Sequence, residues 1–129
     1  MFTTPCYIRK NTPELRKKLE ELGYISNIFN NNDVNNIYVD KLGTYISVDI
    51  ENHPYYIDCG TNEELFLALA ALRDDSDYMQ WFVNENGYFE MCFNDKVENY
   101  LCGYGVRKYR QIDETYHKAT AEEIIEHFK

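Results

Sequence analysis

The fold is decided by residues 57–93, which read IDCGTNEELFLALAALRDDSDYMQWFVNENGYFEMCF. The first part predicts a helix, because Thr61 followed by Glu64 has the spacing of a capping box. Eight consecutive apolar residues then fill positions 65–72. A helix that is apolar on every side must be covered on most sides, so we expect it inside the fold. Eight residues are too few for a membrane span, which needs roughly 20.

The second part of this stretch predicts a β-hairpin that turns at Asn86 and Gly87, a dipeptide that tolerates the positive φ angles of a type I′ turn. A loop of these two residues places Phe82 opposite Met91. One face of the hairpin then carries Phe82, Phe89, Met91 and Phe93, and the other carries Met79, Trp81, Val83 and Cys92. Because both faces are apolar, we expect the hairpin in the centre of a sheet, covered on both sides.

The other segments alternate between strand and helix signals. Short strands are expected at residues 5–9, 37–39, 45–50, 55–57 and 106–112. The face formed by Ile46, Val48 and Ile50 should meet the buried helix. An N-terminal helix is expected to follow Thr12 as its N-cap and to end at Gly23.

The C-terminal segment predicts a further short helix. Thr120 and Glu123 repeat the capping-box spacing, and Ile124 lies on the apolar side of the helix that follows. The asparagine-rich segment 27–36 predicts a mobile loop. We therefore expect one α+β domain over residues 1–129, in which a mostly antiparallel sheet packs around a buried central helix, with further helices near both ends.

The composition supports such a core without external help. The chain has 129 residues, of which 44% are hydrophobic, and this is enough to bury a core without a metal or disulfides. Its four cysteines lie far apart, without a C-x-x-C pair, and no apolar signal segment precedes them. This pattern predicts buried, reduced thiols in the cytoplasm and argues against a zinc site. We expect no metal and no cofactor.

The net charge of −9 is concentrated in the middle of the chain. Residues 49–99 contain two Lys/Arg against twelve Asp/Glu, residues 1–48 contain six against five, and residues 100–129 contain five against five. Such a field repels nucleic-acid phosphates and attracts basic protein surfaces, and it also keeps a protein soluble. We therefore expect no direct binding of nucleic acid, and a basic protein surface is the partner that this charge favours.

Three carboxylates, Asp74, Asp75 and Asp77, follow the predicted buried helix. A calcium loop starting at Asp75 fails, because Asn86 stands where a bidentate Glu is needed and Gln80 where Gly is needed. The carboxylates also lie at the negative end of the helix dipole, which they oppose. They are candidates for a partner surface, and a solvated loop is the alternative.

One basic patch contains glycines, at Gly103 and Gly105. Cations and backbone N–H groups can hold phosphate, and a tyrosine can stack on a base. The candidate ligand-binding residues are Tyr104, Arg107, Lys108, Tyr109 and Arg110. No G-x-G-x-x-G or Walker sequence accompanies them, and a charged strand face is the alternative.

Nucleophilic catalysis has few candidate residues in this chain. A Cys59 thiol activated by His53 or His117 depends wholly on how the chain folds. The alternative is a buried thiol with solvated imidazoles. We expect a non-enzymatic protein with no catalytic residues.

Three segments of the chain are considered together: CYIRKNTPELRKKLEELGY at 6–24, IDCGTNEELFLALAALRDDSDYMQWF at 57–82 and HKATAEEIIEHFK at 117–129. In these segments the chain resembles small uncharacterised accessory proteins encoded by phages and prophages of gut bacteria. The resemblance implies a cytoplasmic protein made in an infected or lysogenic host, and it assigns no catalytic residue.

Two functional hypotheses follow. The first is an acidic, non-enzymatic protein that binds a host or phage protein, for example to inhibit a defence or nucleic-acid enzyme at its basic site. The alternative is a protein that sequesters a nucleotide or another small phosphate ligand. A homodimer formed by pairing of exposed strand edges is compatible with either hypothesis.

Overall fold

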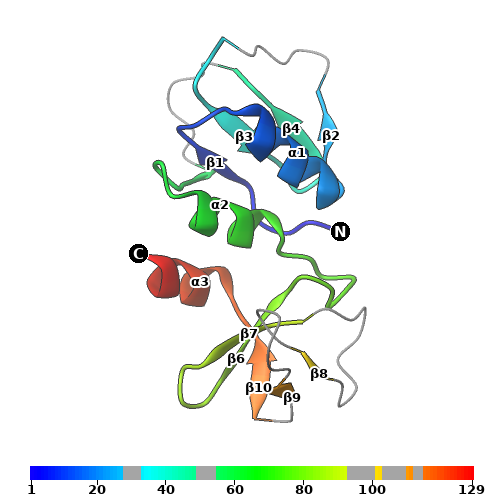
Figure 1. Ribbon diagram of the computed structural model, residues 1–129, viewed down its shortest axis with the longest axis vertical. Helices are drawn as coiled ribbons and strands as arrows, with labels where there is room; N and C mark the ends of the chain where they lie inside the picture. The colour runs from blue at the N-terminus through cyan, green and yellow to red at the C-terminus, as the bar shows by residue number, and fades with distance from the viewer. Residues whose placement is uncertain (28–32, 49–54, 93–100, 103–109, 112–114) are drawn as a thin grey trace.

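Helix α2 (Glu63–Ala70) lies between two sheets in the computed structural model (Figure 1). The structure describes residues 1–27, 33–48, 55–92, 101–102, 110–111 and 115–129. Helix α2 packs on strand β1 (Cys6–Ile8) on one side and on helix α3 (Ala121–Phe128) on the other. The predicted α+β fold around a buried central helix is therefore confirmed.

The first sheet has five strands in the order β2-β4-β3-β1-β5, where the other members are β2 (Ile25–Ser26), β3 (Ile37–Val39), β4 (Thr44–Ile46) and β5 (Ile57–Asp58). The second sheet has the order β10-β6-β7 and consists of β6 (Trp81–Asn84), β7 (Phe89–Met91) and β10 (Tyr116–Lys118). A separate ribbon pairs β8 (Leu101–Cys102) with β9 (Arg110–Gln111). The β1–β5 and β2–β4 pairs are parallel, and the other described pairs are antiparallel.

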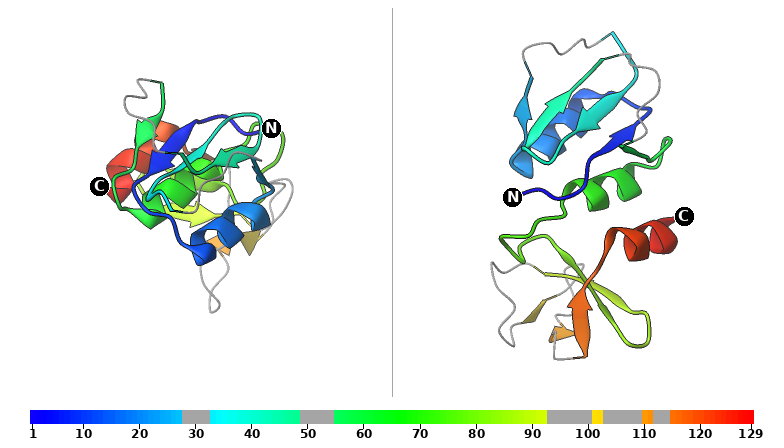
Figure 2. Two further views of the ribbon diagram at one scale, coloured as in Figure 1. Left: turned by 90° about the horizontal axis from the view of Figure 1, so that it is seen from above. Right: turned by 180° about the vertical axis from the view of Figure 1, so that it is seen from behind.

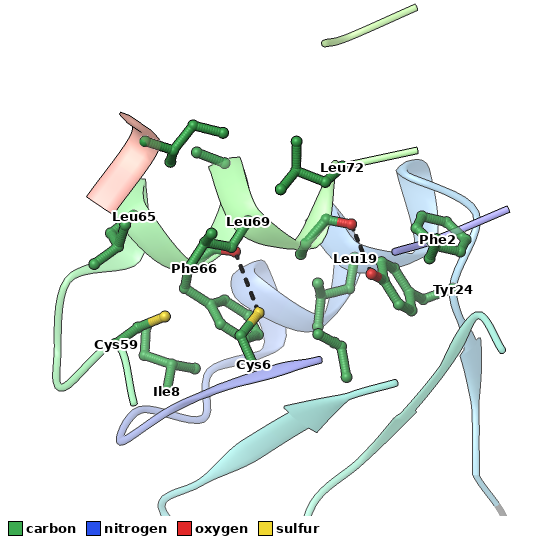
Figure 3. Close-up of a cluster of buried hydrophobic side chains, with 14 of the residues drawn as sticks. Phe2, Cys6, Ile8, Leu19, Tyr24, Cys59, Leu65, Phe66, Leu69 and Leu72 are labelled. Atoms are coloured by element: carbon green, nitrogen blue, oxygen red, sulfur yellow. Dashed lines mark hydrogen bonds between the residues drawn. The ribbon is translucent and has the colours of Figure 1, made fainter. Parts of the chain in front are cut away.

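The apolar run of α2 is buried as predicted. Phe66, Leu69 and Ala70 have no exposed surface. Figure 3 shows Phe66 directed toward Cys6 and Ile8 of the first sheet. Helix α1 (Pro13–Glu21) lies on the same face of this sheet as α2 (Figures 1 and 2), which explains why the apolar surface of α2 is covered on most sides.

The predicted start of α2 is wrong by one residue. The N-cap is Asn62 instead of Thr61, and the Asn62 Oδ1 atom accepts a hydrogen bond of 3.1 Å from the Leu65 N–H. Asn caps a helix at least as well as Thr. The Asn62 amide also donates to the Phe128 carbonyl oxygen at 2.8 Å. The cap therefore joins the start of α2 to the end of α3.

The end of α2 is buried, so its last carbonyl groups cannot bond to water. The Tyr24 hydroxyl donates to the Ala70 carbonyl oxygen at 2.6 Å (Figure 3), and the Thr3 N–H donates at 3.1 Å to the carbonyl oxygen of Leu72, just beyond the C-cap residue Ala71. Burial raises the pKa of Tyr24 well above its usual range, so this phenol stays protonated and remains a donor. Residues far from α2 in the sequence thus supply hydrogen-bond donors at its C-terminus.

Gln80 is the second side chain that completes this helix end. Its amide nitrogen donates to the carbonyl oxygens of Ala71 and Tyr78, and its amide oxygen accepts a bond of 2.8 Å from the Arg73 N–H. The side chain is buried, at 1% exposure. Met79, just before it, has a φ of +62°, the left-handed conformation that few non-glycine residues adopt. This turn immediately precedes Gln80, whose side chain reaches the end of α2.

The predicted hairpin register is also wrong by one residue. Trp81 pairs with Met91 and Phe82 pairs with Glu90, whereas the two-residue loop required Phe82 opposite Met91. A shift of one residue moves one strand's side chains to the other face. The main core therefore contains Trp81, Val83, Phe89 and Met91, and a small second cluster contains Phe82, Cys92 and Tyr116. Strand β6 is central in its sheet, whereas β7 ends the described order.

The Asn84 side chain explains the longer loop. Its Oδ1 atom accepts hydrogen bonds of 2.9 Å from the Asn86 and Tyr88 N–H groups. The loop is residues 85–87, with Gly87 at a φ of +82°. Asn86 is not among the described non-glycine residues with a positive φ, which excludes the type I′ turn. A three-residue loop that ends in a left-handed residue is the next common hairpin connection.

The expected inward face of the strand at 45–50 is the wrong one. Tyr45 is buried at 3% exposure, whereas Ile46 and Val48 are half-buried, and Ile50 lies outside the described residues. Strand β3 sets this orientation, because Val39, a core residue, pairs with Tyr45. Directly paired residues point to the same face of a sheet.

Several local predictions are confirmed. Thr12 caps α1, and Gly23 follows the end of that helix with a φ of +106°. The capping box of Thr120 and Glu123 is present at the start of α3, and Ile124 is fully buried. All of these signals involve residues within one or two helical turns of each other.

The remaining predictions are tested only in part. Cys6, Cys59 and Cys92 are buried and belong to no disulfide, and the side chain of Cys102 is not among those that the structure describes. Half of the asparagine-rich segment, residues 28–32, and most of the predicted strand 106–112 lie outside the described residues as well. Within the described part of the chain, no helix is long and apolar enough to cross a membrane.

The loop geometry predicts different effects for two neighbouring substitutions. A Cβ atom at Gly87 would meet no atom within 4 Å, so Gly87→Ala changes only the backbone energy. We expect this variant to lose about 1–2 kcal/mol of unfolding free energy, the cost of a left-handed L-residue. Asn86→Ala should change it by less than about 0.5 kcal/mol. Urea denaturation measures both changes in unfolding free energy. A larger loss for Asn86→Ala than for Gly87→Ala would contradict the three-residue loop and favour the two-residue turn.

The buried end of α2 predicts a large cost for removing its side-chain donor. Gln80→Met keeps the size of the side chain but leaves the Ala71 carbonyl and the Arg73 N–H unpaired, so we expect a loss of about 2–4 kcal/mol. Tyr24→Phe removes one donor and should cost about 1–2 kcal/mol. Equilibrium denaturation compares the two variants. A Gln80→Met protein as stable as the wild type would show that these bonds do not hold the helix end.

Candidate functional site

The predicted acidic partner surface is paired with cations of the same chain. The N-terminal amine lies 3.5 Å from the Asp74 carboxylate and also contacts Asp75. The Arg73 guanidinium donates two hydrogen bonds to Asp75, at 3.1 and 3.2 Å. Arg73, together with the amine, lowers the pKa of Asp75 well below its usual range.

Asp77 is paired in the same way. Its carboxylate lies 3.1 Å from the Lys118 ammonium, which also donates to the carbonyl oxygens of Arg73 and Ser76 at 3.1 and 2.8 Å. Lys118 therefore adds a positive charge near the negative end of α2, beside the three carboxylates of this link. The amine, Arg73 and Lys118 balance Asp74, Asp75 and Asp77, so this link presents little net charge to a partner.

The predicted phosphate site remains a prediction. Tyr104, Arg107, Lys108 and Tyr109 lie outside the described residues. Arg110 begins strand β9, where its backbone pairs with Cys102.

The candidate nucleophile Cys59 and one of its two candidate bases, His117, are not brought together. Cys59 is buried beside the first sheet (Figure 3), whereas His117 belongs to β10 of the second sheet, on the far side of α2 (Figure 1). The His117 Nε2 atom lies 2.9 Å from both carboxylate oxygens of Glu123. His53 lies outside the described residues. Within the described ranges, no group of three or more His, Cys, Asp or Glu residues could hold a metal ion.

Three tyrosine rings pack against one another on the first sheet. Tyr7 of β1 pairs directly with Tyr38 of β3, and their rings stack with centroids 4.9 Å apart. The Tyr56 ring meets Tyr38 edge-on, with centroids 5.7 Å apart. We call these three residues the tyrosine layer. Tyr38, in the middle, is only 4% exposed, so the layer is tightly packed.

Strand alternation places this layer on the face away from the helices. Cys6 and Ile8 are fully buried under α2, so Tyr7 between them must point to the opposite face. Helices α1 and α2 both lie on the inner face, and no described helix covers the outer face (Figure 2). Tyr7 and Tyr56 are half-buried and Tyr38 is buried between them, so the exposed part of the tyrosine layer consists of Tyr7 and Tyr56.

A charged pair borders the layer. The Arg9 guanidinium lies over the Tyr7 ring, 5.6 Å from its centroid, and donates to the Asp58 carboxylate at 3.1 Å and to the Tyr7 hydroxyl at 3.4 Å. The other oxygen of Asp58 accepts a bond of 2.8 Å from the Gly60 N–H. The carboxylate is thus held from two sides.

Burial and neighbouring groups shift the pKa values of Asp58, Tyr7 and Tyr56. Partial burial alone would raise the pKa of Asp58, but the Gly60 N–H, Arg9 and Tyr7 outweigh it and lower the pKa. Burial first, and then the hydrogen bond to Asp58, raise the pKa of Tyr7. Burial and the nearby charge of Asp40 raise the pKa of Tyr56. The layer therefore carries protonated hydroxyls beside the ionised Asp58 carboxylate at neutral pH.

Sequence reasoning did not find this site. Tyr7 and Tyr38 come from strands β1 and β3, and Tyr56 directly precedes β5, so only strand pairing between distant segments brings the layer together. The available signal was the position of Tyr7 between two apolar residues of a predicted strand. Comparisons with protein-family models, curated proteins and solved structures find no match for this chain.

The Arg9–Asp58 contact predicts a measurable titration. The Asp58 carboxyl should titrate below its ordinary pKa of about 3.9, and Arg9→Ala should raise its pKa. Since the folded-state pKa lies below the unfolded value, the pair contributes stability above the unfolded pKa and loses it as pH falls through the folded pKa. Carboxyl ¹³C NMR measures the shift, with Lys17→Ala as a control of equal charge change. Equal Asp58 pKa values in the wild type and the Arg9 variant would contradict this contact.

Proposed function

We propose that this chain is a non-enzymatic binding protein that recognises a basic segment of another protein through the tyrosine layer. The observation that carries the proposal is the stacked set of Tyr7, Tyr38 and Tyr56 beside Asp58, on a sheet face that no described helix covers. Tyrosine and arginine are enriched at protein interfaces, and tyrosine is enriched among residues that dominate binding energy.

Packing prepares the layer for binding. Each tyrosine ring is restrained by its neighbour, so less side-chain freedom is lost when a partner covers it. The ring faces offer apolar area and attract cations, while the hydroxyl groups offer hydrogen bonds. A preformed surface of this kind favours a specific contact with one partner segment.

The charge of the chain favours a basic partner. With a net charge of −9, the protein repels phosphates and attracts cationic surfaces from a distance. This attraction mainly accelerates association, and salt screens it over roughly 10 Å at 0.1 M ionic strength. The proposed partner is a host or phage protein with a cationic site, such as a defence or nucleic-acid enzyme that the chain inhibits by covering that site.

Affinity capture from a bacterial host lysate tests this function. We expect the wild-type chain to retain a basic protein at low salt and to lose most of it at high salt. Tyr7→Ala should lose the same protein, because it removes a ring of the tyrosine layer. Tyr88→Ala is the matched control, because Tyr88 is 59% exposed but directly follows the hairpin loop of the second sheet.

Circular dichroism must show that both variants are folded. The proposal fails if Tyr7→Ala retains the same proteins as the wild type, or if the captured proteins are unchanged between low and high salt.

A further inference from the structure

We propose that Tyr7 and Asp58 form an arginine-binding site that Arg9 of the same chain occupies and that an arginine of the partner takes over. This inference rests on the proposed function and names the side chain that the tyrosine layer recognises. Its basis is the position of the Arg9 guanidinium, which contacts the Tyr7 ring, the Tyr7 hydroxyl and the Asp58 carboxylate together.

The geometry suits a guanidinium better than an ammonium. The Arg9 group lies over the face of the Tyr7 ring, and one of its nitrogens reaches both the Tyr7 hydroxyl and Asp58. A planar guanidinium stacks on an aromatic face and still directs N–H groups to a carboxylate at its edge. Lysine has a compact, strongly hydrated charge and cannot do both equally well. The site should therefore prefer arginine.

Arg9 can be displaced without disturbing the site. Its side chain is 58% exposed, and exposed ion pairs are weak. Its backbone stays fixed, because the Arg9 N–H donates to the Gly60 carbonyl oxygen. The Asp58 carboxylate also stays in place, because the Gly60 N–H holds its other oxygen. An incoming arginine would therefore find the acceptor already oriented.

The surroundings argue against an anionic ligand at the same place. Asp58 already neutralises Arg9. Lys10, the next residue in the chain, and Lys18 are both paired with Glu63, at 2.8 and 3.2 Å. A phosphate would have to break these pairs, whereas a guanidinium replaces one that is already there.

The test is an NMR titration of the full ¹⁵N-labelled chain with three capped peptides. Each peptide alternates glycine with arginine, with lysine, or with citrulline, which has the shape of arginine without its charge. We expect the arginine peptide to shift the amides of β1, β3 and β5 and to bind tighter than the lysine peptide. The citrulline peptide should not bind measurably.

Variants separate this site from general attraction to an acidic protein. Arg9→Ala should bind the arginine peptide about threefold tighter or more, because it removes the competing side chain. Lys17→Ala makes the same change in net charge on the exposed side of α1 and should bind less than about 1.5-fold tighter. Asp58→Asn keeps the oxygen that accepts the Gly60 N–H and should weaken binding about fivefold.

The inference is overturned if Arg9→Ala and Lys17→Ala bind equally, or if the lysine peptide binds as tightly as the arginine peptide. These failures leave the proposed function intact as long as Tyr7→Ala still loses the captured partner. Retention of that partner by Tyr7→Ala would instead refute the proposed function itself.

Discussion

The buried C-terminus of α2 is the constraint on which the rest of the structure depends. The last carbonyl groups of a helix have no partner within the helix, and a buried helix end cannot use water. Tyr24 and Gln80 supply these hydrogen bonds, to Ala70 and to the C-cap residue Ala71, and the backbone of Thr3 binds the carbonyl group of Leu72 just beyond. Thr3 belongs to the N-terminal segment, Tyr24 directly precedes strand β2 of the first sheet, and Gln80 directly precedes strand β6 of the second sheet. The chain must therefore place all three segments around one helix end.

This arrangement also determines where the protein can act. With α2 packed between the sheets and α1 beside it, the inner face of the first sheet is covered (Figures 1 and 2). Strand alternation then directs Tyr7 and Tyr38 outward, at positions that pair across β1 and β3. The same register that builds the core thus assembles the tyrosine layer. The surface proposed for binding is the outer side of the sheet that holds α2.

Sequence reasoning succeeded where the signal was local. The buried helix, the Thr12 cap and the Thr120 capping box depend on residues within a few positions of each other. It failed where a side chain formed hydrogen bonds that changed a loop, and where residues distant in the sequence come together. The Asn84 side chain lengthened the hairpin loop, and the register moved by one residue. The tyrosine layer depends on strand pairing between distant segments, and no pattern in one sequence specifies that pairing.

Native-state hydrogen exchange tests the central claim most directly. If α2 is the element around which both sheets are held, the amides of Phe66 and Leu69 should exchange only through global unfolding. Their exchange free energies should then equal those of the most protected amides in β1 and β6. Exchange of the α2 amides through a smaller opening, while amides of both sheets stay protected, would contradict this account.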